Sequence, residues 1–431
     1  MSNIQKHEMD SNSNHKKNVL HGFFLSISTT IAEPHTILPL IISHFGGGSI
    51  LIGFFSSLLR GGAIIVQLYA AFHAQSYPYM LKYLRRVFII RFLSWFLIGV
   101  ALYIFGDDYP NASLFSIGIG LFIFSFSAGF GAIYFKEITA KIFTHKFRGK
   151  TMAVRQFFSA FAAIISGAGT GYIISSFEAP LSYAVLFMVS AFLMAIGLFA
   201  FGTVSEPIKE NVTKKEKSFK LFLQNALITL KGDKNLQIQV TTFLFAYSYL
   251  FALPFIIIDA NTKIDIDGTT IGLLITAQMV GAMLSNFAWG KLSGNGHNKL
   301  IANITISMTI LAITLAFFAS NLILYMIIFF IVGASIDGNR IASGNLILIL
   351  APEEKRPVYS ALQTNITSFG MFFSLLGGVL LHFTSFTTLY IFTLICLSIS
   401  LYISFKLIIC LETVYRLFAS GDQFFTKHLG F

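Results

Sequence analysis

Charged side chains are scarce in this sequence. They make up 11% of the 431 residues, while apolar residues make up 55%; a soluble domain of this length carries about 25% charged residues. One core cannot bury so much apolar surface, so we expect the surrounding medium to be lipid. The net charge of +11 does not indicate nucleic-acid binding, because the basic residues lie in short segments between apolar runs rather than on one polar face.

Cysteine is also rare. Cys396 and Cys410 lie in one apolar run, about 21 Å apart along a helix, which is too far for a disulfide. The sequence has no zinc-ligand spacing and no Gly-Lys-Ser/Thr phosphate loop, so we expect no metal, no cofactor and no ATP hydrolysis. Residues 1–18 are polar and lead into a full-length apolar run, unlike the short apolar core of a cleavable signal peptide.

Long apolar runs are abundant. Each is long enough to cross a hydrocarbon layer of about 30 Å, which takes roughly 20 helical residues. Backbone groups in lipid must be satisfied within the segment, and the runs do not alternate with a period of two, so we expect helices. The twelve predicted spans are 19–44, 50–74, 87–106, 113–135, 151–176, 181–203, 236–258, 270–290, 300–319, 323–349, 359–382 and 388–410.

One polar segment divides these spans into two sets of six. Residues 204–235 carry seven lysines and no long apolar run. We therefore predict an all-α integral membrane protein with two pseudo-symmetric six-helix bundles, residues 19–203 and 236–410, joined by a basic linker. Two polar tails, 1–18 and 411–431, complete the chain.

The distribution of basic residues predicts the orientation. Of the 30 Lys and Arg residues, 24 fall in segments on the same side as the N-terminus, and only Lys263 falls in an opposite loop. By the positive-inside rule, both termini and the linker lie in the cytoplasm, and the number of spans is even. The opposite loops are predicted to carry the acidic residues Asp107, Asp108, Glu178, Asp259, Asp265 and Asp267.

The two halves resemble each other. Arg148 and Arg356 match at an offset of 208, and similar Ser/Thr and Phe residues follow each of them. Near the start of each half, ILPLI at 37–41 resembles ALPFI at 252–256. Several matches in the same order indicate two homologous bundles.

With these features the sequence resembles the major facilitator superfamily of secondary transporters, over about residues 19–410. The resemblance implies a multi-pass protein of the bacterial inner membrane, expected to be a monomer, with a central cavity lined by the first, fourth, seventh and tenth helices. The family often has an Asp in a Gly-x-x-x-Asp-basic-x-Gly-basic loop after its second helix. Here that loop, residues 73–86, keeps Lys82, Arg85 and Arg86 but lacks the Asp.

Two candidate site residues lie in the middle of the first span. Glu33 precedes Pro34, which removes a helix N–H and, with Pro39, should loosen the helix. Glu33 is either a proton or cation site or a structural partner of a cation such as Arg60. His35, about 200° further around a continuous helix, should not share the face of Glu33; it is a relay or an interhelical contact.

A second candidate pair lies in the tenth span. Asp337 and Arg340 share a helix face at i,i+3 and can neutralise each other. Alternatively, Arg340 contacts an anionic group of the substrate, or Asp337 accepts a proton. Arg60 in the second span is as well explained by pairing with an acid as by substrate contact.

Further polar residues complete the candidate set. Tyr247 and Gln278 lie within the seventh and eighth spans, where each is either a pathway residue or an interhelical hydrogen bond. Arg155 begins the fifth span and is interpreted as a bridge between helices at the inner gate. Arg148 and Arg356 are placed with it at the cytoplasmic edge.

These observations predict a secondary transporter that moves a small molecule by alternating access, coupled to protons, in a lipid bilayer and without nucleic acid. A receptor or scaffold that retains the fold without transporting is the alternative, and a membrane-embedded enzyme is a third, weaker option. Buried charges argue against a scaffold, because each costs about 2.5–3.5 kcal/mol on insertion scales.

Overall fold

Helices account for all regular structure in the described part of the chain. The computed structural model describes residues 3–31, 33, 35–74, 77–208, 228–352 and 355–407. Within these ranges ten helices are long and apolar enough to cross a membrane. A broken first span and α3 bring the total to the twelve predicted spans.

The first half of the chain forms six spans. Their helices are α1 (Asn3–Ile31), α2 (Ile37–His44), α3 (Ser49–Ala74), α4 (Leu81–Phe105), α5 (Pro110–Ile142), α6 (His145–Ser176) and α7 (Leu181–Gly202). The second half repeats this arrangement. Its elements are α9 (Lys234–Ala246), η1 (Tyr247–Phe251), α10 (Leu253–Lys263), α11 (Gly268–Gly294), α12 (Asn298–Phe318), α13 (Leu322–Leu350), α14 (Arg356–Ser368), η3 (Phe369–Phe372), α15 (Phe373–Phe383) and α16 (Phe386–Phe405).

Interruptions occur in the first, seventh and eleventh spans. In the first, α1 ends at Ile31 and α2 begins at Ile37, where the sequence predicted a loosened helix; Pro34 itself lies outside the described residues. The seventh span changes to the 3₁₀ helix η1. Pro254 then lies in the first turn of α10, where a backbone N–H would have no partner within the helix.

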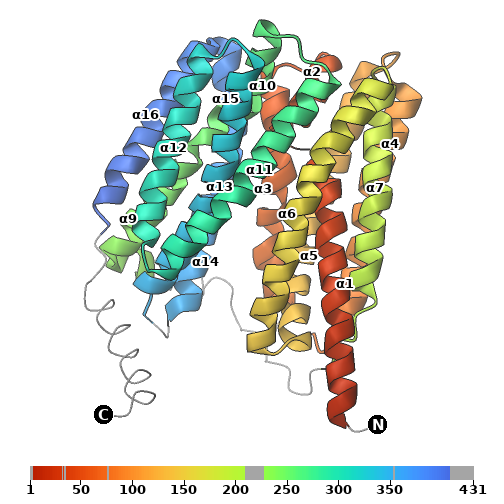
Figure 1. The fold of residues 1–431 in the computed structure, drawn as a ribbon, viewed down its shortest axis with the longest axis vertical. Coiled ribbons are helices and arrows are strands. Elements are labelled where there is room, and N and C mark those ends of the chain that lie inside the picture. The colour runs from red at the N-terminus through yellow and green to blue at the C-terminus, as the bar shows by residue number, and fades with distance from the viewer. Residues whose placement is uncertain are drawn as a thin grey trace.

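The helices form two bundles that touch at one end. α1 and α3–α7 pack among themselves, as do α9–α16, and the main contacts between the sets are α6 with α11 and α3 with α15. Figure 1 shows the start of α1 and the end of α16 at one end of the molecule. The inter-bundle contacts lie toward the other end, where α2 also meets α10.

Glycines make these contacts close. A Cβ on Gly171 of α6 would lie 2.7 Å from the carbonyl oxygen of Gly268, the first residue of α11. A Cβ on Gly53 of α3 would likewise collide with the carbonyl oxygen of Ser374 in α15. At these crossings the two bundles approach backbone to backbone, which only glycine permits.

Candidate functional site

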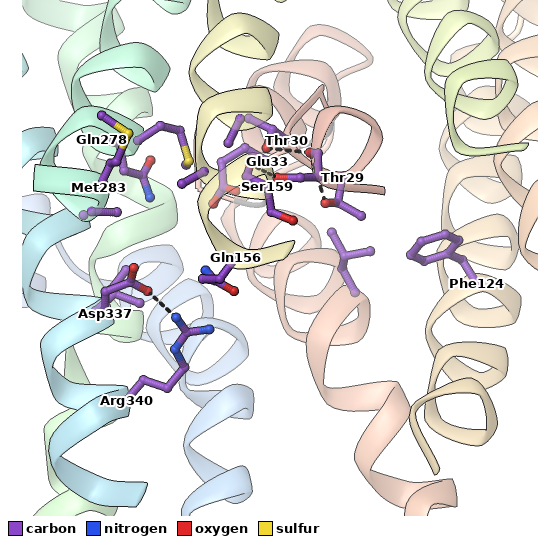
Figure 2. A pocket seen from close by; sticks show the side chains of 18 of the residues that line it. Thr29, Thr30, Glu33, Phe124, Gln156, Ser159, Gln278, Met283, Asp337 and Arg340 are labelled. Carbon is purple, nitrogen blue, oxygen red and sulfur yellow. Dashed lines mark hydrogen bonds and ion pairs between the residues drawn. The ribbon is translucent and has the colours of Figure 1, made fainter. Parts of the chain in front are cut away.

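A cavity of about 410 Å³ lies between the two bundles. Its wall comes mainly from α1 and α6 on one side and from α11 and α13 on the other. The polar residues that line it are Ser26, Thr29, Thr30, Glu33, Gln156, Ser159, Gln278, Asp337 and Arg340. Figure 2 shows Glu33 and the Asp337–Arg340 pair on opposite sides of this space. Three of the charged residues expected from the sequence are therefore brought together.

Glu33 lies at the break between α1 and α2. Its side chain is buried, and its Oε1 is 3.7 Å from Nε2 of His35, which is also buried. The expectation that His35 would face away from Glu33 was wrong. It assumed a continuous helix, but α1 ends at Ile31, and the turn at His35 and Thr36 brings the imidazole back toward the carboxylate.

Asp337 and Arg340 form the pair expected from their spacing on α13. Arg340 Nη2 lies 3.0 Å from Asp337 Oδ1, and the Asn286 amide donates to Asp337 Oδ2 at 2.8 Å. The Asp337 side chain is 18% exposed, and the Arg340 side chain is 61% exposed. Most of the Arg340 side chain, which lines the cavity, is therefore exposed while one guanidinium nitrogen holds Asp337.

Hydroxyl groups near Glu33 are bound to backbone carbonyls. Ser26 donates to the Ser159 carbonyl oxygen at 2.6 Å, which joins α1 to α6. Thr30 donates to the Ser26 carbonyl oxygen at 2.9 Å, and Thr29 to that of Leu25 at 2.9 Å. With their protons used in this way, these oxygens are left as acceptors at the cavity wall.

Two other predicted pathway residues differ in placement. Gln278 of α11 lines the cavity and is buried. Tyr247 does not line it: its ring stacks on Tyr249 at 6.2 Å, and its Cβ lies against Gly370 of η3. The seventh span changes to a 3₁₀ turn there, and Tyr247 packs against the eleventh span, so its place on the pathway stays a prediction.

The structure describes the side chains of only some of the basic residues predicted for the second span and the cytoplasmic edge. Arg155 Nη1 donates to Asn18 Oδ1 at 3.0 Å, and its Cζ lies 4.5 Å from the Phe135 ring, so it bridges α6 to α1 and α5 within one bundle. Arg148 lies in the first turn of α6, where its backbone N–H donates to Thr144. The side chains of Arg60 in α3 and Arg356 in α14 lie outside the described residues.

An aromatic part of the wall was missed in the sequence. Trp95 and Phe124 line the cavity with ring centroids 4.2 Å apart, and the Arg91 guanidinium carbon lies 4.6 Å from the Phe124 ring centroid. Arg91 is buried in α4. Its position within an apolar run was a signal that could have identified it, since charges in membrane spans usually face the interior.

One acidic residue assigned to a loop is buried instead. Asp259 lies in α10, where Tyr390 donates to its Oδ2 at 2.9 Å and Lys263 Nζ lies 2.7 Å from the same oxygen. The loop assignment was wrong, because α10 extends to Lys263. These contacts tie the end of α10 to α16, near the closed end of the protein.

Known proteins are similar to this chain in part of its sequence and in its fold. The family model for the Major Facilitator Superfamily matches residues 238–413, which cover the second bundle. The solved structures described below match the fold over both bundles. The second bundle of this chain is therefore similar to the major facilitator superfamily in sequence, and the whole chain is similar in fold to solved transporters. Members of this superfamily are secondary transporters built from two repeats related by an axis along the membrane normal.

Solved structures of several transporters are similar in fold over nearly the whole chain. A mutant of the nucleoside transporter NupG has a TM-score of 0.73 at 11% identity, covering 91% of this chain and 99% of that one. A bacterial homologue of the iron transporter ferroportin, in an inward-facing state, has a TM-score of 0.68 at 12% identity, covering 94% and 99%. A D-xylose–proton symporter has a TM-score of 0.64 at 14% identity, covering 91% and 96%. No curated protein sequence matches the chain.

Proposed function

We propose that this protein carries a small solute across the bacterial inner membrane by alternating access, as a proton-coupled monomer. The observation that supports this most directly is the cavity between the bundles, with Glu33 on one wall and Asp337 and Arg340 on the other. Each charge placed at mid-membrane costs about 2.5–3.5 kcal/mol on insertion scales. A protein that does not transport has little reason to keep three such groups around an open space.

The shape corresponds to the inward-facing state if both termini are cytoplasmic. The bundles then touch at the outer end, through α2, α10 and the glycine crossings. Exposure also rises along α13 toward the end of the molecule where both termini lie. Gly333 is buried, whereas the Arg340 side chain is 61% exposed. The solute would leave the cavity toward the cytoplasm in this state. Separation of the bundles at the glycine crossings would open the other side.

Glu33 is the group we assign to proton coupling. It is buried at a helix break beside His35, in the bundle opposite Arg340. A buried carboxylate can hold a proton while the cavity faces one side and release it when water reaches it from the other. Arg340 is the group we assign to an anionic or polar part of the solute, because a guanidinium offers several donors in a fixed geometry.

Counterflow tests whether the protein transports at all. Growth of a deletion strain on single nutrients and toxins would first select candidate solutes. Vesicles containing the purified protein and unlabelled solute should then accumulate the labelled solute transiently. Empty vesicles should not. If no selected solute gives counterflow while the protein is folded in the vesicles, the non-transporting receptor is the better description.

A further inference from the structure

An apolar groove of about 370 Å³ runs between α4 and α7 on the outer face of the first bundle. Figure 1 shows both helices at the edge of the molecule away from the second bundle, so the groove faces the membrane. Its walls include Phe88, Ile89 and Phe92 of α4 and Leu198 and Phe199 of α7. Ile89 is 58% exposed and Phe199 is 76% exposed. The volume lies in the range of small-molecule pockets, about 300–1,000 Å³.

Arg85 lies at one end of this groove. Its Nε donates to the Gly202 carbonyl oxygen at 2.7 Å, at the last residue of α7. A Cβ on Gly202 would lie 3.8 Å from Arg85 Cγ, so the arginine stem packs across the end of the helix. Among the described residues the guanidinium has no acidic partner, and Arg85 is exposed. The two NH₂ groups of Arg85 therefore remain available at the end of this apolar groove.

More positive charge surrounds this end. Lys82 and Arg86 are exposed in the first turns of α4, and Lys17 Nζ donates to the Thr203 carbonyl oxygen at 2.6 Å. The nearest described carboxylate along the chain after α7, Glu206, cannot neutralise them. Its side chain is fully buried and is bound to Lys141 and to backbone amides at the start of α4. The result is a cluster of four cations where α4 begins and α7 ends.

We propose that the α4–α7 groove binds a phospholipid with an anionic headgroup. One acyl chain lies along the phenylalanine-rich wall, and the phosphate meets Arg85. Because α4 begins and α7 ends here, the cations lie at the level of the headgroups, where Lys and Arg attract anionic lipids. The paired N–H groups of a guanidinium match the geometry of a phosphate. The acyl chain of a zwitterionic lipid would contact the same wall, but its headgroup would be attracted less strongly by the four cations.

A second copy of the protein is the main competing occupant of this groove. Docking a helix there would remove Arg85 from water, and the groove lining offers no carboxylate to compensate. A lipid phosphate supplies that negative charge itself. The anionic lipid therefore explains both the apolar wall and the basic end, whereas a second copy explains only the wall.

Native mass spectrometry of the purified full chain tests this directly. The protein is titrated with a phosphatidylglycerol and with a phosphatidylcholine that has the same acyl chains. We expect tighter binding of phosphatidylglycerol to the wild type. Arg85→Gln should weaken that binding about fivefold, since one surface cation contributes roughly that factor toward an anionic lipid. Arg85→Lys should keep most of it, and phosphatidylcholine binding should not change.

The matched control is Lys291→Gln, an exposed cation on α11 of the other bundle. It should leave phosphatidylglycerol binding unchanged. Equal affinities for the two lipids in the wild type would overturn the proposal. Equal losses of phosphatidylglycerol binding in Arg85→Gln and Lys291→Gln would also overturn it. So would a dimer without bound lipid that dissociates in Arg85→Gln. The groove is separate from the central cavity, so these outcomes do not depend on whether the protein transports.

Discussion

The carboxylate of Glu33 and the imidazole of His35 lie 3.7 Å apart at the break in the first span. On an unbroken helix they would face in very different directions. The break therefore creates a pair of ionisable groups at the level of the central cavity, which Glu33 lines. Across that cavity, Asp337 and Arg340 form the second charged group. Transport as proposed depends on these two groups belonging to bundles that move against each other.

Gly171→Ala should shift the conformational equilibrium away from the state closed at the outer end. The new Cβ would meet the Gly268 carbonyl oxygen at 2.7 Å, and such overpacking typically costs about 1–3 kcal/mol. Spin-label distances across the outer end of the two bundles should lengthen, and counterflow should fall.

Gly169→Ala is the matched control for that variant. It lies on the same helix and gains the same helix propensity, but nothing lies within 4 Å of the new Cβ. Its distances and its counterflow should match the wild type. Equal behaviour of the two variants would show that the glycine crossing does not hold the outer end closed.

Asp337 and Arg340 can be separated into structural and substrate-binding roles. If Arg340 only neutralises Asp337, then Arg340→Gln should impair counterflow, and the double variant Asp337→Asn/Arg340→Gln should restore it. If Arg340 contacts the solute, as proposed, the double variant should remain as impaired as Arg340→Gln alone, with apparent affinity reduced about tenfold or more, a loss consistent with one charged hydrogen bond. Recovery of transport in the double variant would exclude the substrate contact.

Glu206→Gln should lower thermal stability through the start of α4. The Glu206 carboxylate accepts from the backbone N–H of Leu81 at 2.7 Å and lies 2.6 Å from Lys141 Nζ. Losing a charged hydrogen bond in a buried position costs about 1.5–3 kcal/mol. The unfolding temperature should drop by several degrees, while Glu178→Gln, in an exposed loop, should have no measurable effect. Equal unfolding temperatures for both variants would show that the contact of Glu206 with the start of α4 contributes nothing to stability.

His15, which precedes the first predicted span, should make stability depend on pH. Burial, followed by the nearby charge of Lys150, lowers the pKa of His15 from its usual 6.5, and its Nδ1 lies 2.6 Å from Thr151 Oγ1. The unfolded chain therefore binds this proton more readily, so the contribution of His15 to stability should decrease as the pH falls through about 6.5. His15→Gln should reduce this decrease between pH 7.5 and 5.5. A variant with an unchanged pH profile would contradict this assignment.

The sequence predicts the helices of this protein better than its contacts. The predicted spans 113–135 and 270–290 lie within α5 and α11, because lipid demands long apolar helices whatever they pack against. The charged residues Glu33, Asp337 and Arg340 could be selected from the same principle, since charge in a span must face the interior.

What the sequence could not predict depends on tertiary packing. The position of His35 beside Glu33 follows from where α1 stops, and the burial of Asp259 from how far α10 continues. The contact of Tyr247 with Gly370 likewise depends on a 3₁₀ turn in the seventh span. Likewise, the loop at residues 73–86 lacks the family's acid, yet Glu206, remote in sequence, binds the first turn of α4 within that segment.

Solute uptake by Glu33→Gln vesicles, with and without an imposed pH gradient, is the most direct test of proton coupling through the cavity. Asp265→Asn, an exposed loop carboxylate, is the control and should behave as the wild type. We predict that Glu33→Gln loses the stimulation of uptake by the gradient while retaining counterflow, because the amide cannot exchange the proton but leaves the cavity intact. Uptake that the gradient still drives as strongly as in the wild type would contradict the account.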